Sequence, residues 1–451
     1  MLRTYQSEDV EYLKPHDRVA ILSEQRTGKT PIALTLAREW GFDKCVIVTT
    51  SSTLFQWKAE CEKWLGATPT VVYGNVKQKQ NLLDKPGKII IISYSTIKRP
   101  EYIEYFLYKY ARPDILILDE CHHMRNTKTE TYKQLIKLSK RAHKLILMTG
   151  TPCYNKQTDI YPILQMLYPM EFTSLYKFYH KHCTPKQVYT PRGIVTQFDD
   201  ISPESIPYIQ SIINERAVNR KRKEVMQWLP EIEVELLKLP PTPNQLKYLE
   251  QLKKTFRTDK GEIDCPSVVS RLIRYRQICL DPKLLELKGE SPKVQFILSF
   301  IEENPYTPVL IFSNFTSFLK KLYAEIKSPK ALLSGDTSPE YRAELVEDYQ
   351  AGKYNVLLLN TIAAKEGLTL DRAEVEIFTD YFPPIGAVEQ AEARFIATTP
   401  TRAEIPKRII RLVLEGTYDE NIMALLEKRA DETEVINNFK EVINGKSDIP
   451  V

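Results

Sequence analysis

The sequence predicts an α/β fold with two parallel-sheet domains and a largely helical region between them. Short β-branched runs alternate with helical patterns in the first part of the chain, and the same alternation returns in the last part. Such alternation is typical of parallel sheets whose two faces are covered by helices. A chain of 451 residues is also too long for one hydrophobic core.

The first domain is expected to cover residues 1–160. Its predicted strands are the apolar runs at 18–24, 44–50, 88–94, 114–120 and 144–150. A helix is predicted at 30–40, directly after the first strand. The alternation of strands and helices favours a parallel sheet.

The middle region, residues 161–288, differs from this pattern. The stretches at 161–183 and 267–280 are typical of helices, and a proline cluster at 238–245 interrupts the region. The basic run NRKRKE (219–224) either contacts a nucleic-acid backbone or forms a solvated helix face.

The last domain, residues 289–451, repeats the first pattern. Strands are predicted at 307–314, 354–360 and 374–380, and a helix at 315–326. Two αβ halves around a helical middle suggest a duplicated architecture.

The composition is that of a globular protein. Hydrophobic residues make up 43% of the chain and charged residues 27%, which is unlike a disordered chain. The net charge of +5 permits nucleic-acid binding without requiring it. No apolar run is long enough to span a bilayer and the N-terminus lacks a signal-peptide core, so we expect a cytoplasmic location and no membrane partner.

The cysteines indicate a reducing compartment. There are seven, an odd number, and no CxxC pair occurs. The segment HKHC offers His180, His182 and Cys183 as metal ligands, but a second ligand cluster is missing. We therefore expect no structural zinc.

Gly28, Lys29 and Thr30 form a candidate phosphate-binding loop. They follow a predicted strand and precede a predicted helix, which is the context that such a loop requires. Its backbone N–H groups and lysine would face phosphate, and the threonine hydroxyl would reach Mg²⁺. The glycine expected at its start is missing, because Ser23 and Arg26 stand there. On its own, the GKT sequence leaves a chance match open.

Asp119 and Glu120 form the second half of the candidate nucleotide site. They end the predicted strand at 114–120, where core packing does not explain two carboxylates. One carboxylate would hold Mg²⁺ and the other would polarise the attacking water. An exposed acidic pair at the start of a loop is the alternative. GKT and LDE each follow a strand within one domain, which favours the nucleotide site.

Thr149, Gly150, Thr151 and Pro152 follow another predicted strand. Their hydroxyls could sense the nucleotide site and couple it to a partner domain. An ordinary turn rich in glycine and proline is the alternative.

The ordered set RTGKT (26–30), LDECHH (118–123) and MTGTP (148–152) resembles motifs I, II and III of superfamily 2 helicases, with a DECH box. The resemblance covers nearly the whole chain and is closest to Snf2-type proteins. LRTYQ (2–6) is similar to the element whose glutamine reads adenine, and 48–64, with Gln56 and Trp57, resembles motif Ia. Further matches are 91–99 with motif Ib, 219–252 with the Snf2 bridge, 309–322 with motif IV, 357–370 with motif V and 388–394 with motif VI.

This resemblance implies two RecA-like motor domains that bind ATP and Mg²⁺ in a cleft and act on DNA. The implied activity is a DNA-dependent ATP hydrolase, a helicase or translocase that remodels branched DNA such as forks and junctions. The small size is similar to phage branch-migration helicases, which would place the chain in the host cytoplasm. We expect a monomer.

The resemblance also implies the roles of individual residues. ATP binding falls to Gln6, Arg26, Thr27, Gly28, Lys29 and Thr30, and Mg²⁺ binding to Thr30 and Asp119. Catalysis falls to Lys29, Glu120, Gln390 and Arg394. DNA contacts fall to Thr50, Ser51, Ser52, Ser95, Thr96, Thr361 and Lys365, and coupling to Thr149, Thr151 and Gly367. Trp57 and Trp64 are expected to pack against helices rather than stack on bases.

Two positions depart from the family pattern. Arg26 stands where a glycine is usual, and Ala397 stands where motif VI usually has a second arginine that acts as a finger. Arginine fingers contribute orders of magnitude in rate. Either Arg394 serves alone, or Arg402 replaces the finger, or ATP turnover is slow.

Three functions therefore stay open. The first is the motor that remodels branched DNA. The second is a double-strand translocase that does not separate strands, and the third is a degenerate ATPase that acts as an ATP-gated DNA clamp. The Snf2-like elements favour DNA over RNA.

Overall fold

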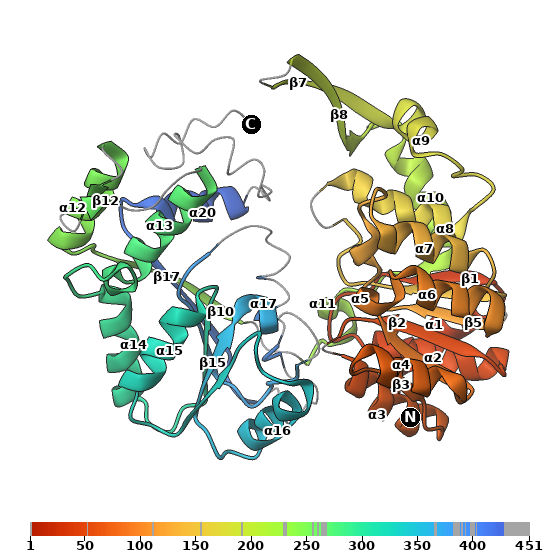
Figure 1. The fold of residues 1–451 in the computed structure, drawn as a ribbon, viewed down its shortest axis with the longest axis horizontal. Helices are drawn as coiled ribbons and strands as arrows, with labels where there is room; N and C mark the ends of the chain where they lie inside the picture. Colours follow the sequence, from red (N-terminus) through yellow and green to blue (C-terminus); the bar gives the residue numbers. More distant parts are fainter. Residues whose placement is uncertain are drawn as a thin grey trace. The chain divides into compact units, whose positions relative to one another are not determined.

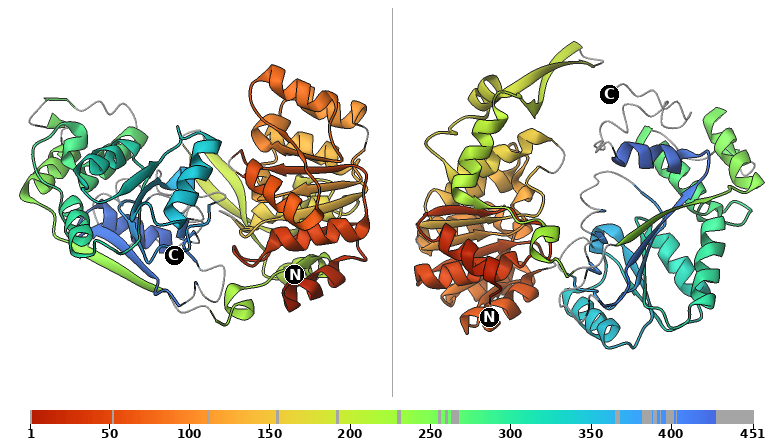
Figure 2. Two further views of the ribbon diagram at one scale, coloured as in Figure 1. Left: turned by 90° about the horizontal axis from the view of Figure 1, so that it is seen from below. Right: turned by 180° about the vertical axis from the view of Figure 1, so that it is seen from behind.

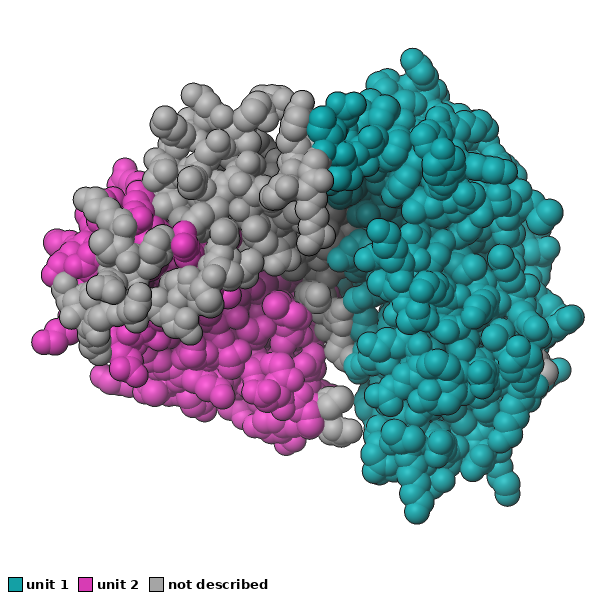
Figure 3. Space-filling model, turned by 45° about the horizontal axis from the view of Figure 1, so that its top comes forward, with its two compact units in different colours: residues 1–227 teal, residues 228–451 magenta. Residues whose placement is uncertain are grey.

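The computed structural model describes residues 2–51, 53–110, 112–153, 156–190, 193–228, 232–254, 257–258, 261–262, 268–364, 368–381, 388, 391–392, 394–396, 402 and 404–427. The chain divides into two compact units, residues 1–227 and 228–451, which Figure 3 colours separately. The predicted middle region is thus shared between the units, and the three-part division of the chain stays a prediction. Every described helix is too short or too polar to cross a membrane.

A parallel sheet of seven described strands forms the centre of the first unit (Figure 1). The strands are β1 (Arg18–Ile21), β2 (Cys45–Thr49), β3 (Thr70–Val72), β4 (Ile89–Ser93), β5 (Ile115–Leu118), β6 (Lys144–Met148) and β9 (Ala217–Val218). Their spatial order is β3-β4-β2-β5-β6-β1-β9, and every pairing is parallel. The five strands predicted for this domain are confirmed, whereas β3 and β9 are too short for an apolar run to reveal.

Helices cover both faces of this sheet. One face carries α1 (Thr4–Leu13), α2 (Lys29–Trp40) and α3 (Leu54–Leu65), and the other carries α5 (Tyr94–Ile97), α6 (Pro100–Glu104), the π-helix η1 (Tyr105–Lys109), α7 (Glu130–Ser139) and α8 (Tyr161–Leu167). In β2, Ile47 packs with the first set and Val46 and Val48 with the second. Alternate side chains of a strand point to opposite faces, so continuous apolar runs are what a sheet covered on both sides requires.

The remaining elements of the first unit surround this core. They are α4 (Val76–Asp84), the 3₁₀ turns η2 (Cys121–Met124) and η3 (Gln157–Ile160), α9 (Leu175–His182), α10 (Ile206–Arg216) and α11 (Arg222–Val225). Of the stretches predicted to be helical in the middle region, 161–183 is confirmed by α8 and α9 and 267–280 by α13 (Val268–Leu280), whereas α10 was not predicted.

A β-hairpin between α9 and α10 was not predicted from the sequence. Its strands, β7 (Cys183–Thr190) and β8 (Gly193–Ile201), pair antiparallel and project from the rest of the first unit (Figure 1, Figure 2). Tyr179 of α9 stacks on Phe198 at 5.0 Å between ring centroids and holds the base of the hairpin. Its outer part exposes Ile194 and Val195, so it lacks the buried face that produces a clear strand pattern.

A second parallel sheet, of six described strands, forms the centre of the second unit. The strands are β10 (Glu233–Leu239), β13 (Val309–Ser313), β14 (Lys330–Leu333), β15 (Val356–Asn360), β16 (Val375–Phe378) and β17 (Arg408–Leu414). Their order is β10-β17-β16-β13-β15-β14, again with parallel pairings. The three predicted strands are confirmed and the predicted α/β fold with two parallel sheets is correct.

Helices also cover both faces of the second sheet. One face carries α12 (Pro243–Lys254), α13 (Val268–Leu280), α16 (Pro339–Gln350) and α20 (Tyr418–Glu427), and the other carries α14 (Pro292–Glu303) and α15 (Thr316–Glu325). The shorter elements are β11 (Arg257–Thr258), β12 (Gly261–Glu262), η4 (Pro282–Leu285) and α17 (Thr361–Ala364). α15 confirms the helix predicted at 315–326.

The segment that connects the units adds one strand to each sheet. Before the connection, β9 pairs with β1 of the first sheet, and after it β10 pairs with β17 of the second sheet along its whole length. The stretch that resembles the Snf2 bridge (219–252) therefore begins next to the first sheet and supplies an edge strand to the second.

Candidate nucleotide and nucleic-acid site

The loop between β1 and α2 has the form of a phosphate cradle. Gly28 caps the N-terminus of α2 with φ 79°, a left-handed conformation that favours glycine. A Cβ atom built on Gly28 would lie 2.1 Å from Nε2 of Gln6, so a side chain has no room there. The first N–H groups of α2 lack intrahelical acceptors and carry a partial positive charge, which suits an anion.

Arg26 adopts a backbone conformation that favours glycine. Its φ is 70°, so it is one of the few described non-glycine residues in the left-handed region. An L-residue loses roughly 1–2 kcal/mol in this conformation. The neighbouring Thr27 is buried and donates from Oγ1 to the Glu24 carbonyl at 2.7 Å. The loop therefore tolerates the departure from the family pattern at the cost of local strain.

Helix α1 packs its polar side against this loop. Gln6 is buried, donates from Nε2 to the Thr27 carbonyl at 3.3 Å and accepts from the Arg3 N–H at 2.8 Å. The Tyr5 hydroxyl donates to the same Thr27 carbonyl at 2.8 Å. The structure thus brings Gln6 to the nucleotide loop, and its contact with adenine stays a prediction.

Lys29 joins the loop to the two other predicted motifs. Its Nζ donates to the carbonyls of Ser23 at 3.1 Å and Glu24 at 3.3 Å. A Cβ atom built on Gly150 would lie 3.5 Å from this Nζ. Burial raises the pKa of Asp119, and the charge of Lys29 opposes this rise, which places the two groups close in space. Residues from 28–30, 119–120 and 149–151 therefore converge at the edge where the strands of the first sheet end.

Asp119 is held by three donors. Its Oδ2 accepts hydrogen bonds from Thr49 Oγ1 and Trp57 Nε1, each at 2.8 Å, and its Oδ1 accepts from the Glu120 N–H at 3.0 Å. Burial and the neighbouring Glu120 charge raise the pKa of Asp119 to about 6, although these donors oppose the shift. For Trp57, the sequence favours packing against helices over stacking on bases. It does pack in the core, but a buried indole N–H also needs an acceptor, and Asp119 supplies it.

Glu120 and the turn after β6 are linked through His122. Glu120 has φ 46°, a strained left-handed conformation. Its Oε2 lies 3.2 Å from Nδ1 of His122, and the same Nδ1 lies 3.0 Å from the Thr149 hydroxyl. That hydroxyl accepts from the Thr151 N–H at 3.1 Å. The predicted coupling residues Thr149 and Thr151 are thus joined to the acidic pair, through a histidine that the sequence analysis did not single out.

The oxygen atoms at this edge of the sheet are suitable ligands for a magnesium ion. Thr30 and Asp119 offer a hydroxyl and a carboxylate, the hard oxygen ligands that Mg²⁺ prefers. A divalent cation beside Asp119 would offset the burial that raises its pKa. For zinc, the described residues contain no group of three or more His, Cys, Asp or Glu side chains placed to hold a metal.

Half of the basic run 219–224 supports the nucleotide loop. Arg220 donates to the buried Asp9 at 2.9 and 2.7 Å, and its N–H donates to the buried Ser23 hydroxyl at 3.0 Å. The Arg222 N–H donates to Glu24 at 2.9 Å. Lys221 and Lys223 are exposed. The sequence offered two roles for the basic run, contact with a nucleic-acid backbone or a solvated helix face. Arg220 has neither role in the structure, because it bonds to Asp9 and Ser23 within the first unit.

Two of the predicted DNA-binding hydroxyls meet at this sheet edge. Ser51 and Ser95 are exposed and their Oγ atoms lie 3.1 Å apart, although 44 residues separate them. Thr50 and Thr96 are buried. The Thr50 hydroxyl bonds to that of Thr53 at 3.0 Å, and the Thr96 hydroxyl accepts from Nζ of Lys79 at 3.0 Å. Lys79, which the sequence analysis did not name, brings a cation to the same place.

The second unit holds the other predicted residues. Thr361 begins α17 at the carboxyl end of β15, and its buried hydroxyl makes no hydrogen bond to a described residue. Arg394 is buried and donates from Nη1 to the Leu368 carbonyl at 3.4 Å, and Arg402 is partly exposed. Ser52, Lys365, Gly367, Gln390 and Ala397 lie outside the described residues.

Comparison with known proteins identifies the family. A family model described as the SNF2-related domain matches residues 7–284, and one described as the helicase conserved C-terminal domain matches residues 292–396. The first match covers more than half of the chain. This chain belongs to the SNF2-related family. The first match ends at residue 284 and the second begins at residue 292, and both positions lie within the second compact unit of the SNF2-related chain.

Curated relatives of this SNF2-related chain match along most of its length. The DNA annealing helicase and endonuclease ZRANB3 of Mus musculus is 23% identical over 97% of the chain and 41% of its own length. The SWI/SNF-related matrix-associated actin-dependent regulator of chromatin subfamily A-like protein 1 of Xenopus laevis is 24% identical over 95% and 43%. The ATP-dependent helicase fft1 of Schizosaccharomyces pombe is 26% identical over 84% and 46%. The chain therefore spans less than half the length of these relatives.

A solved structure, the Sulfolobus solfataricus SWI2/SNF2 ATPase core in complex with dsDNA, is similar to the SNF2-related chain with 20% sequence identity and a TM-score of 0.45. The similarity covers 99% of this chain and 93% of that one.

Proposed function

We propose that this chain is an ATP-dependent DNA motor that remodels branched DNA, by fork regression and junction branch migration. One observation carries the proposal: Lys29, Asp119 and Gly150 converge at one sheet edge in a SNF2-related chain. Relatives that match nearly the whole chain are named as annealing helicases, which supports branched DNA as the substrate.

In this proposal the first unit binds ATP through its loop and the N-terminus of α2. The Lys29 ammonium group donates to phosphate oxygens in place of the Ser23 and Glu24 carbonyls. Gln6, Arg26 and Thr27 also contact the nucleotide. Thr30 and Asp119 would hold Mg²⁺, whose charge would help neutralise the phosphates. Glu120 orients the attacking water through its carboxylate. Gln390 and Arg394 of the second unit stay predictions for the hydrolytic machinery.

DNA contacts are proposed to begin at the exposed Ser51 and Ser95 of the first unit, next to Lys79. Hydroxyl groups and lysines bind phosphates without reading bases, which suits a motor that moves over any sequence. Thr50, which directly precedes Ser51, is bonded through Thr53 to Thr49, and Thr49 donates to Asp119, so one predicted DNA contact and the proposed Mg²⁺ ligand share one chain of hydroxyls. This chain of contacts supports coupling of DNA binding to ATP hydrolysis. A monomer in the cytoplasm is part of the proposal.

The test is ATP hydrolysis by the purified protein, alone and with single-stranded, duplex, forked and four-way-junction DNA. We expect forks and junctions to stimulate hydrolysis more strongly than linear duplex. Equal stimulation by every duplex would replace the proposal with a translocase that does not separate strands. ATP binding without hydrolysis on any DNA would favour the ATP-gated clamp, which the strained Arg26 motivates.

A further inference from the structure

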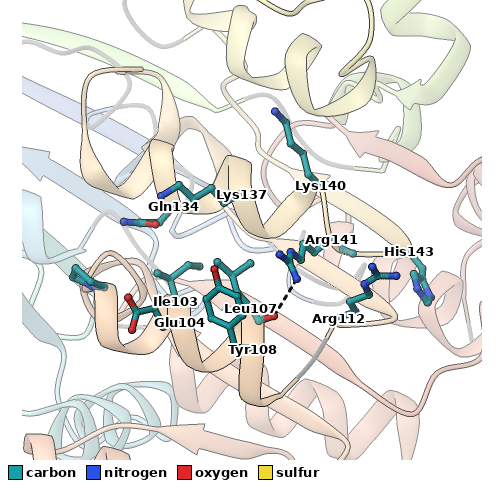
Figure 4. A pocket seen from close by; sticks show the side chains of 12 residues that line it. Ile103, Glu104, Leu107, Tyr108, Arg112, Gln134, Lys137, Lys140, Arg141 and His143 are labelled. Atoms are coloured by element: carbon teal, nitrogen blue, oxygen red, sulfur yellow. Dashed lines mark hydrogen bonds between the residues drawn. The ribbon is translucent and has the colours of Figure 1, made fainter.

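A basic groove lies on the first unit, apart from the nucleotide site. It has a volume of about 860 Å³ and runs between α6–η1 on one side and α7 on the other (Figure 4). Its basic end is formed by residues that directly precede β5 and β6, among them Arg112, Arg141 and His143. The groove therefore reaches the edge where these strands begin, whereas Lys29 and Asp119 lie at the edge where strands end.

The groove carries an excess of unpaired positive charge. Arg112, Lys137, Lys140 and Arg141 line it and are exposed, while Glu104 is the one acidic residue of its described lining. None of the four cations forms an ion pair with a described residue. Such an electropositive concavity attracts phosphate groups.

An aromatic ring and an unsatisfied acceptor complete the groove. The side chain of Tyr108 is 70% exposed, and the Arg141 guanidinium lies 5.6 Å from its ring centroid while donating to the Leu107 carbonyl at 3.3 Å (Figure 4). Gln134 lines the same groove, is 7% exposed, and its Oε1 accepts no hydrogen bond from a described residue. A buried acceptor without a donor costs free energy that a ligand N–H group would recover.

We propose that this groove binds an unpaired strand of DNA. Phosphates would lie against Lys137, Lys140 and Arg112, a base would stack on Tyr108, and a base amino group would donate to Gln134. Cationic grooves with exposed aromatic rings are the general solution for single strands, because every base has a face that can stack. An acidic peptide would use the charges but leave the Tyr108 face unused. The inference rests on the proposed function, since branched DNA offers an unpaired strand to a protein that holds its duplex.

The test uses the full chain and a fluorescent oligothymidylate of about twelve nucleotides, within the range of known single-strand sites. Anisotropy titrations at several salt concentrations compare the wild type with Lys137→Gln/Lys140→Gln. Each lost contact lowers the salt slope by about 0.7, so the double variant should bind about tenfold more weakly at 0.2 M salt and about 70-fold at 0.05 M. The control is Lys128→Gln/Lys133→Gln, which removes the same charge from two exposed lysines outside the groove, one just before α7 and one within it.

A photocrosslinking residue in place of Tyr108 gives an independent readout. It should crosslink to the oligothymidylate, and the same residue in place of Tyr176, which is also 70% exposed, should not. Crosslinking at position 108 to polyglutamate in preference to DNA would overturn the proposal in favour of an acidic peptide. Equal loss of duplex and single-strand affinity in the groove variant would overturn the assignment to an unpaired strand.

The outcomes separate this inference from the proposed function. If the groove variant keeps wild-type affinity and salt slope while forks still stimulate ATP hydrolysis, the groove assignment is wrong and the motor stands. If the wild type binds neither duplex nor single strand, the proposed function fails and the groove assignment fails with it.

Discussion

Trp57 donates its indole N–H to Oδ2 of Asp119 at 2.8 Å, across 62 residues of sequence. Thr49 donates to the same oxygen, so Oδ2 is fully occupied by side chains of the protein. The other oxygen, Oδ1, accepts the Glu120 N–H and keeps a lone pair. The two donors therefore fix the rotation of the carboxylate and decide which of its oxygens can face a cation.

Trp57→Phe should weaken the binding of the divalent cation. The substitution keeps a buried ring and removes one hydrogen bond to a carboxylate, an interaction that contributes roughly 1.5–3 kcal/mol. We expect at least about a tenfold loss of Mn²⁺ affinity in the presence of ADP, measured by electron paramagnetic resonance. ATP hydrolysis should recover at saturating Mg²⁺.

Trp64→Phe is the matched control for this prediction. Its indole N–H donates to Glu60 on the same helix at 2.9 Å, away from Asp119. This variant should bind Mn²⁺ as the wild type does. Equal affinities in the two variants would show that Trp57 serves packing alone.

Gly28→Ala should abolish tight nucleotide binding. The new Cβ would lie 2.1 Å from Nε2 of Gln6, so Gln6 must leave the loop. Gly41→Ala is the control, because Gly41 has φ 71° and nothing within 4 Å of a built Cβ. Both variants carry the strain of a left-handed alanine, about 1–2 kcal/mol, but only the first has the clash. Titration with a fluorescent ADP analogue tests the difference, and equal affinities would contradict the assigned loop.

Glu120→Gln should retain ATP binding and lose hydrolysis by about 10²–10⁴-fold, the usual contribution of a positioned acid or base. The amide keeps the shape of the side chain beside His122, which lies 3.2 Å from Oε2. Steady-state hydrolysis and nucleotide affinity are both measured. Glu130→Gln, at an exposed position of α7, serves as control and should hydrolyse normally. Normal hydrolysis by Glu120→Gln would move the catalytic role elsewhere.

Much of this site could be predicted because its residues stand at the ends of apolar strands. Lys29 and Asp119 follow runs that only a buried sheet explains, and parallel strands bring their carboxyl ends to one edge. The contact of Trp57 with Asp119 could not be predicted, since it depends on β2 pairing beside β5 and on how α3 is turned. The pair of Arg220 and Asp9 spans 211 residues, so a local charge pattern could not reveal it.

Arg220→Ala should destabilise the first unit without changing how DNA binding responds to salt. It leaves Asp9, which is fully buried, without its cation, and breaking such a pair costs about 3 kcal/mol or more. The unfolding temperature should fall by about 6 °C or more for a unit of this size. Arg222→Ala, which breaks an exposed pair with Glu24, should cost less than about 1 kcal/mol. A reduced salt slope in either variant would restore the basic run as a DNA contact.

Arg394→Ala should lower ATP turnover by about 10³-fold or more if this residue supplies the finger. Arg394 is buried and donates to the Leu368 carbonyl, so the variant also tests whether its role is structural. Arg394→Lys keeps the charge but cannot form the same fork of hydrogen bonds. A finger predicts slow turnover in both variants with unfolding temperatures near that of the wild type. A structural role predicts a lower unfolding temperature in Arg394→Ala, with turnover restored on cooling. Normal turnover in both, together with slow turnover in Arg402→Ala, would transfer the finger to Arg402.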